Sequence, residues 1–289
     1  MDLHVARITV QNIMSSRNSC SFALFILLFA APVARGQDTL PLRNRLTFEL
    51  GYARLANFDN VGSPLSYAAG SLPIGGAYEY LGEHDRHTLE GSAIVSLINA
   101  PTMSDRYSSA EDFRKAYFVF LDMQYRYVRQ LMPIFSTPIE LYVGGSLETI
   151  IFGRKYNYYG GDLSSIQGSG SGEYSTALAP TADLLYSLSD DQRLRASLSV
   201  PIFAYIARPG YGLLNGNTSV LGYSYDGRFE FIGSFWSWHV AVEYERDLSR
   251  YFLAGLRFST MYYRYPRFDW VSSTAKNEAK AFISWRFHF

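Results

Sequence analysis

The sequence predicts an all-β protein that forms a single antiparallel up-and-down transmembrane β-barrel of about ten strands. Three observations predict this fold. Apolar and polar residues alternate along many segments, the connections between these segments are alternately short and long, and aromatic residues make up 16% of the chain at a mean hydropathy of −0.06. A helical membrane protein would be far more hydrophobic, and a disordered chain far less aromatic. Barrel strands produce this combination because only every second side chain faces lipid.

The N-terminal residues have the layout of a secretory signal peptide. Arg7 and Arg17 precede the apolar run 22–31, and small residues suited to a signal-peptidase site follow it. A run of this length is too short to span a bilayer as a helix. We therefore expect residues 1–36 to be a signal peptide and residues 37–289 to form the barrel domain.

The leader also decides what chemistry the mature chain can use. Translation could begin at Met1 or at Met14, and in either case removal of the leader takes away Cys20, the only cysteine. Disulfides, cysteine metal sites and cysteine nucleophiles are then excluded from the mature chain. The 26 basic and 26 acidic residues balance, which gives no electrostatic basis for binding nucleic acid.

Ten segments of the mature chain show the alternation expected of strands. The predicted strands are 45–53, 73–81, 86–97, 115–129, 138–152, 174–188, 193–205, 232–247, 251–265 and 278–289.

The connections divide into two kinds that take turns along the chain. The short ones are 82–85, 130–137, 189–192 and 248–250, and the long ones are 54–72, 98–114, 153–173, 206–231 and 266–277. This layout is typical of outer-membrane barrels, with turns on one side of the membrane and loops on the other. It predicts an even number of strands and puts both termini at the end with the short turns, here called the turn end; the opposite end is the loop end.

Each predicted strand has one apolar face, which we expect to point at lipid. In 45–53 this face carries Leu46, Phe48, Leu50 and Tyr52. Tyrosine and tryptophan also gather near strand ends, as at the two boundaries of a membrane. The predicted girdles are Tyr125, Tyr127, Tyr186, Tyr244 and Tyr251 at the turn end, and Trp236, Trp238, Tyr262, Tyr263 and Tyr265 at the loop end. A secreted β-sandwich also alternates, but the length of these segments favours tilted membrane strands.

Residues 281–289 show the most regular alternation, with Trp285, Phe287 and Phe289 on one face. This ending resembles the C-terminal insertion signal of bacterial outer-membrane β-barrel proteins, which finish in an aromatic-rich strand with a terminal phenylalanine. The resemblance implies the outer membrane of a Gram-negative bacterium, with lipid and lipopolysaccharide around the barrel. It also implies that the barrel-assembly machinery recognises this strand. The short turns and many tyrosines look like those of small barrels of Bacteroidota type. No specific family is indicated.

The faces that point into the predicted barrel carry charges of both signs. A barrel of about ten strands is only slightly wider than the eight-stranded barrels that side chains fill. We therefore expect a largely plugged lumen that holds a network of charge pairs, with weak or no conductance. Its predicted members are Glu49, Asp122, Arg126, Glu148, Asp183, Arg195, His239, Glu243, Arg257 and Arg286.

Catalysis has two candidate locations. The chain is similar in length and layout to the omptin proteases, which use acidic pairs and an Asp–His couple at the loop end, but the Asp85–His87 pair here falls at a predicted turn. His239 and Glu243 could instead form a couple like that of a lipid A deacylase or phospholipase. Such a site would have to face lipid, whereas His239 is predicted to face the lumen. A histidine hydrogen-bonded within the network is the interpretation we favour.

The first choice of function is a non-enzymatic surface barrel whose long loops contact an external ligand or partner protein. A narrow channel for small solutes and an outer-membrane enzyme are the alternatives. No cofactor and no metal site is predicted, because the acidic and histidine residues at 83–87 suit a solvated turn. Loop tyrosines could stack on sugars, bury at a partner or pack over the barrel mouth. They are Tyr156, Tyr158, Tyr159, Tyr211, Tyr223 and Tyr225.

Overall fold

The structure is a computed structural model. It describes residues 42–59, 63–99, 115–131, 138–156, 170–209, 225–267 and 270–288. The predicted signal peptide, Phe289 and the loop residues Tyr158, Tyr159, Tyr211 and Tyr223 lie outside these ranges, as do the side chains of Tyr156 and Tyr225.

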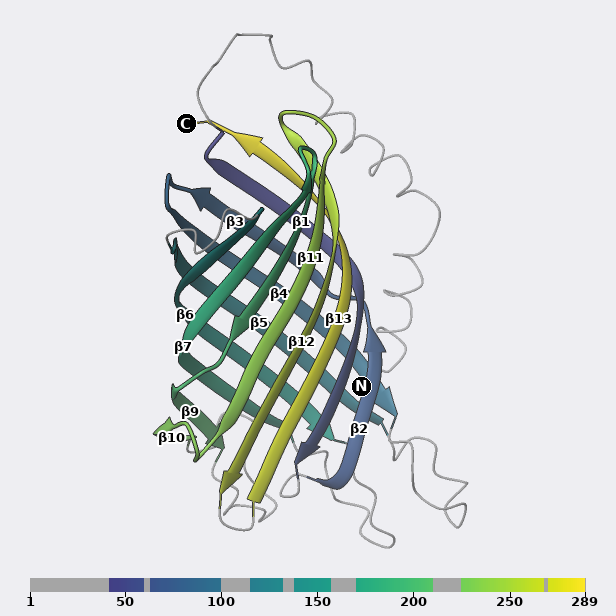
Figure 1. Ribbon diagram of the computed structural model, residues 1–289. Coiled ribbons are helices and arrows are strands. Elements are labelled where there is room, and N and C mark those ends of the chain that lie inside the picture. The colour runs from purple at the N-terminus through teal and green to yellow at the C-terminus, as the bar shows by residue number, and fades with distance from the viewer. Residues whose placement is uncertain are drawn as a thin grey trace, which may run out of the picture. The chain divides into compact units, whose positions relative to one another are not determined.

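The described residues form thirteen strands, and ten of them close into a barrel (Figure 1). The strands are β1 (Asn44–Asp59), β2 (Ser63–Ser71), β3 (Ile74–Leu81), β4 (Asp85–Asn99), β5 (Lys115–Gln130), β6 (Ile139–Tyr156), β7 (Gly170–Ser189), β8 (Gln192–Ser199), β9 (Phe203–Pro209), β10 (Tyr225–Phe231), β11 (Trp236–Asp247), β12 (Phe252–Arg267) and β13 (Trp270–Phe287). No described helix is long and apolar enough to cross a membrane.

The ring is antiparallel throughout. It runs β7-β6-β5-β4-β3-β1-β13-β12-β11-β8, and the pairing of β8 with β7 closes it. The first and last strands are neighbours, with Asn44 of β1 opposite Phe287 of β13. The predicted fold class, a single up-and-down transmembrane barrel of about ten strands, is therefore confirmed. In Figure 1 the strands are tilted and the C-terminal end of β13 lies at the top, at the turn end.

Of the remaining strands, β9 is the end of the predicted strand 193–205 after a break, whereas β2 and β10 lie in the predicted long loops 54–72 and 206–231. Pro73 lies between β2 and β3, and Pro201 lies between β8 and β9. Proline interrupts a ladder because it has no backbone N–H to donate. Between β10 and β11 the chain makes a turn in which Gly233 has φ 105°.

The prediction of two of the long loops, 54–72 and 266–277, is mostly wrong. The range 54–72 holds the end of β1 and all of β2, and the range 266–277 holds the end of β12 and the start of β13. Polar residues occupy both faces here: Ser272, Thr274 and Lys276 are buried, while Asn277 is exposed on the opposite face. The hydropathy alternation disappears near the loop end although the backbone continues as strand.

The exterior is apolar, as the alternation predicts. On β1, Leu46 and Phe48 are 50% and 53% exposed, whereas the intervening Thr47 and Glu49 are buried. Trp236, Trp238 and Tyr262 face outward at the loop end, as predicted for the girdle, but Tyr263 and Tyr265 do not. Both of these tyrosines are buried on the inner face, because inward and outward positions alternate along β12.

At the turn end the connections are tight. The Gly82 N–H donates to the carbonyl of Asp85 at 2.8 Å, and the Asp247 N–H donates to the carbonyl of Asp191 at 2.8 Å. The Ser189 hydroxyl donates to the Asp191 carboxylate at 2.7 Å, and this hydrogen bond lowers the pKa of Asp191. The turns therefore satisfy their own polar groups locally.

Candidate functional site

The barrel interior holds most of the buried charge in the described part of the chain and is the candidate site. Every strand of the ring sends alternate side chains inward, and near the turn end these are mostly charged. We call this set the charged layer: Arg45, Glu49, Glu79, Arg86, Glu90, Asp122, Arg126, Asp183, Arg195, Glu243, Glu245, Arg257, Lys276, Glu278 and Lys280.

Asp183 and Glu79 form one centre of the charged layer. Asp183, at 0% exposure, accepts from Arg195 at 2.8 Å and from Arg126 at 3.3 Å. Glu79 meets Arg45 at 2.8 Å and Arg195 at 3.2 Å, with Arg86 at 3.3 Å. Both carboxylates thus have several guanidinium partners, as buried ions require.

Arg257 forms a second centre. It donates through two nitrogens to both oxygens of Glu90, at 2.9 and 3.0 Å, and it also bonds Glu49 at 3.2 Å. Lys280 contacts Glu49 at 3.2 Å and Glu278 at 3.1 Å. The fork of Arg257 suits bidentate pairing with a carboxylate. It joins β12 to β1 and β4 across the interior.

Closer to the turn end the pairs are more exposed. Arg286 contacts Asp247 at 2.5 and 3.1 Å, and Arg193 contacts the same carboxylate at 2.6 Å. These side chains are only partly buried.

Glu148 is held differently. Its carboxylate accepts from Gln124 at 2.7 Å, from the Ser146 hydroxyl at 3.1 Å and from the Ser199 hydroxyl. These three donors are neutral, so Glu148 is hydrogen-bonded to polar groups where the sequence suggested a charge pair.

His239 lies beside a small cavity of about 20 Å³, large enough for about one water molecule. Asp122, Arg257 and Glu278 also line this cavity. In the described part of the chain, His239 Nε2 is buried without a hydrogen-bond partner.

The structure does not bring His239 and Glu243 together as a hydrogen-bonded couple among the described contacts. Glu243 instead faces Arg257 at 3.3 Å and Arg195 at 3.8 Å. Ser199 is the register partner of His239 across β8 and β11, but its hydroxyl donates to Glu148. A nucleophile, a base and an orienting acid therefore do not line up here.

His87 belongs to the outer surface at the turn end. Its Nδ1 lies 2.8 Å from the Tyr125 hydroxyl, and its ring lies 4.9 Å from that of Tyr127. Asp85 is 3.9 Å away. Among the described residues, no group of three or more histidine, cysteine or acidic side chains is arranged to hold a metal ion.

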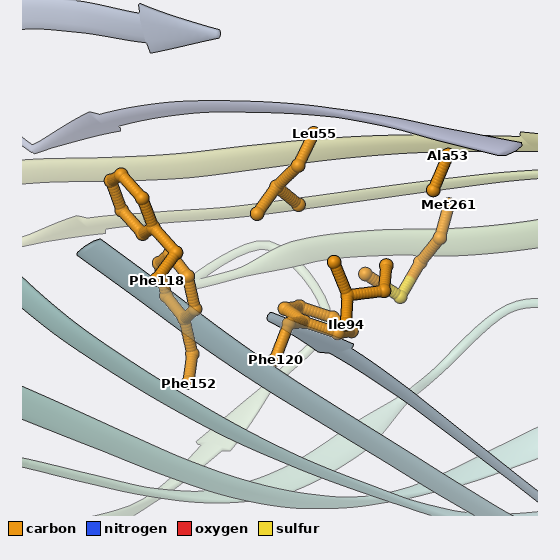
Figure 2. Packing of buried hydrophobic residues seen from close by; sticks show 7 residues of the cluster. All are labelled: Ala53, Leu55, Ile94, Phe118, Phe120, Phe152 and Met261. Atoms are coloured by element: carbon orange, nitrogen blue, oxygen red, sulfur yellow. The ribbon is translucent and has the colours of Figure 1, made fainter. Parts of the chain in front are cut away.

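Toward the loop end, inward residues on most strands are apolar, and we call this set the apolar layer; β13 is the exception, because Ser272, Thr274 and Lys276 are buried there. One part is Ala53, Leu55, Ile94, Phe118, Phe120, Phe152 and Met261, and the other is Ala177, Ala204, Ile206, Phe235, Tyr263 and Tyr265. The rings of Phe118 and Phe152 stack with centroids 5.3 Å apart. Figure 2 shows Ala53 and Leu55 pointing from β1 toward the aromatic rings on the other strands.

The apolar layer adds buried apolar groups to a lumen for which the sequence predicted a network of charge pairs. A signal for it exists in the sequence: residues 117–121 are apolar on both faces, unlike a strand that lines a polar lumen. Met261 and Tyr263 are successive inward positions on β12, so the two parts of the layer adjoin there.

The C-terminal strand closes the barrel and carries aromatic residues outside. Trp285 and Phe287 have ring centroids 4.8 Å apart, and Phe289 lies outside the described residues. All ten predicted members of the lumen network lie on the inner face, but Glu148 and His239 have no charge pair among the contacts described above.

Comparison with known proteins gives similarity of fold without a family. No family model matches the chain, and no curated protein does so either. Among solved structures, the chain is similar to the outer membrane protease OmpT from Escherichia coli, with 11% identity over 87% of this chain and 100% of that one and a TM-score of 0.48. It is also similar to OprG from Pseudomonas aeruginosa, with 9% identity over 86% of this chain and 98% of that one and a TM-score of 0.36. Neisserial surface protein A is similar with 9% identity over 84% of this chain and 97% of that one and a TM-score of 0.32.

Proposed function

We propose that the protein is a bacterial outer-membrane barrel that is closed to ions along its axis and acts at the cell surface without catalysis. Its long loops would contact an external ligand or partner protein. The signal peptide 1–36 would direct export, and the aromatic C-terminal strand would be recognised during assembly. Lipid and lipopolysaccharide would surround the barrel.

The apolar exterior supports a membrane location. Its residues are exposed to an extent that water would penalise but lipid would not. Among the most exposed are Leu46, Phe48, Leu50, Tyr52, Ile74, Leu89, Met123, Leu178, Leu256, Phe258 and Ile283. They come from strands all round the ring, so the apolar surface forms a band and not a local patch.

The single observation that supports a lumen closed to ions is that two layers of side chains fill it. The described cavities within the charged layer have volumes of about 20 and 10 Å³, each with room for about one water. A hydrated ion needs a continuous aqueous path. The apolar layer then fills the same axis with rings and aliphatic side chains, which offer an ion no polar partner. The Lys276 ammonium, which lies beside this layer over the Phe120 ring, is already paired with Asp122 and Glu278.

Planar-bilayer recording tests closure. Purified barrel should give no steady conductance steps at moderate voltage, while a general porin added to the same bilayer provides the positive control. The triple variant Phe118→Ala, Phe120→Ala, Phe152→Ala removes three rings from the apolar layer only. Steady pores in the wild type would show that the lumen conducts and that the narrow-channel alternative is correct.

Surface contact needs a separate test. Cells that display the barrel should bind components of a glycan array or a panel of immobilised extracellular proteins. Replacing residues 157–169 with a glycine–serine linker should abolish that binding, because it removes Tyr158 and Tyr159. A same-length replacement of 101–113 is the matched control. Unchanged binding after both replacements would contradict a role for these loops.

A further inference from the structure

The barrel wall is not hydrogen-bonded all the way round at the loop end. β12 pairs with β11 only as far as Arg264, opposite Trp236, although it continues to Arg267. Beyond Trp236 the chain turns away, and β10 pairs with β9. Within the described ranges, β10 and the end of β12 share no ladder. We call this break the β10–β12 seam.

The seam exists because residues 232–235 fold into a turn of their own. The Ser234 N–H donates to the Phe231 carbonyl at 3.0 Å, and the Gly233 N–H donates to the Phe235 carbonyl at 3.3 Å. Gly233 has φ 105°, which favours glycine because a Cβ would be strained there. These backbone groups bond within the turn, so they are not used to pair with β12.

Side chains close the seam instead. Phe235 is 1% exposed and packs in the apolar layer with Tyr263 and Tyr265 of β12. The Tyr265 hydroxyl donates to Glu230 of β10 at 2.8 Å. A wall held by side chains opens through rotamer changes and the loss of few hydrogen bonds, whereas an intact ladder would have to lose several backbone bonds together.

The outer side of the seam is apolar and faces the bilayer boundary. Phe231 is 64% exposed, Ile232 50% and Trp236 55%. Arg264, at the last paired position of β12, is exposed beside them. The seam therefore has apolar side chains on both faces, with the hydrogen-bonded Tyr265–Glu230 pair as its polar group inside, and a cation at the level where lipid headgroups lie.

We propose that the β10–β12 seam is a lateral gate through which an acyl chain of an outer-leaflet lipid enters the apolar layer of the lumen. The chain finds apolar contacts at Phe235 and Tyr263 and cannot continue toward the turn end, because the charged layer lies beneath. A β-strand of another protein would have to break the Tyr265–Glu230 bond to fill the seam, whereas an alkyl chain can lie beside it. This gate goes beyond the proposed function, from which it takes only the orientation of the loop end.

Thiol alkylation from the membrane tests the gate. The barrel with Phe235→Cys, refolded in phosphatidylcholine vesicles, is treated with N-dodecylmaleimide. The matched control is Phe152→Cys, which is equally buried in the apolar layer but lies behind full ladders to β5 and β7. Because local opening is confined to the seam, the thiol at 235 should react at least about tenfold faster than the thiol at 152. Equal rates would overturn the proposal, and so would equally fast reaction at 235 with a water-soluble sulfonated maleimide.

A second measurement uses the unaltered barrel, which avoids any folding defect of the variants. Vesicles contain a phospholipid with a photoreactive diazirine near the end of one acyl chain, and adducts are mapped by mass spectrometry. Adducts on Phe235 or Tyr263 support the gate. Adducts confined to outward residues such as Phe231 and Phe258 overturn it. Loss of the adducts on Phe235 and Tyr263 at high protein-to-lipid ratio also overturns it, because a second copy of the protein would then occupy the seam. Ion conductance along the axis is a separate readout, so failure of the gate and failure of closure are distinguishable.

Discussion

The two layers of the lumen are stabilised by different physics. In the charged layer, oppositely charged side chains reach across the interior, as Arg257 of β12 does to Glu90 of β4. In the apolar layer, rings and aliphatic groups fill space, as Phe118 and Phe152 do by stacking. A buried ion has lost its hydration and depends on a partner, whereas a buried ring depends on close packing. The layers should therefore respond differently to truncation and to salt.

The largest effect is expected from Asp183→Ala in the charged layer. Asp183 is fully buried, and its loss leaves Arg195 and Arg126 without their shared carboxylate. Breaking such a buried pair from one side costs about 3–5 kcal/mol. Denaturant titration of the barrel in lipid vesicles measures the free energy of unfolding.

The control for this change is Asp191→Ala, because Asp191 pairs with Arg246 at the exposed turn end, at 3.6 Å. Its free energy of unfolding should stay within experimental error of the wild type. Equal destabilisation by the two alanines would contradict the partner dependence claimed for the charged layer.

A somewhat smaller effect is expected from Phe118→Ala in the apolar layer. Phe118 is 1% exposed, and its removal loses the stacking on Phe152 and leaves a cavity. We expect a loss of about 3 kcal/mol. The loss should be the same at low and at high NaCl, since the stacking lost is between two uncharged rings; a strong salt dependence would show that the two layers are energetically coupled.

The charged layer was the more predictable of the two from sequence. Residues such as Glu49 and Arg257 are polar positions between apolar ones, so their inward direction follows from alternation alone. Which residues pair with one another could not be predicted from alternation. Arg257 and Glu49, for example, are 208 residues apart in the chain and meet only because the ring closes. Sequence alternation gives the face of a strand, but the register between strands depends on the whole barrel.

The apolar layer and the seam were harder to predict from sequence, for a different reason. Phe118 and Phe120 lie among Tyr117, Val119 and Leu121, so hydropathy cannot separate the inner from the outer face. The strand breaks at Pro73 and Pro201 carried a local signal, but the turn at 232–235 was included in a predicted strand. Gly233 alone does not distinguish a turn from an ordinary strand glycine.

Salt should separate the buried part of the charged layer from its exposed rim. Asp247 pairs with Arg286 and Arg193 but remains partly exposed. We expect Asp247→Ala to cost about 1 kcal/mol or less. The cost should fall further as NaCl rises, because exposed pairs are screened. The Asp183→Ala cost should change little in the same titration, and a parallel fall in both would contradict the difference in burial.

The smallest effect is expected at the boundary between the layers, where His239 is opposite Met261 of the apolar layer and beside the cavity lined by Asp122 and Arg257. Its Nε2 has no hydrogen-bond partner among the described residues, so His239→Ala removes no bond made through that atom. We expect a change of less than about 1 kcal/mol in the free energy of unfolding.

Incubation of the wild type with phospholipid and lipopolysaccharide should release no fatty acid, since neither Ser199 nor Glu243 is aligned with the imidazole of His239. Acyl release that disappears in His239→Ala would assign catalysis to this boundary, and it would mean that the polar cavity next to the apolar layer is a substrate site and not a gap in the packing.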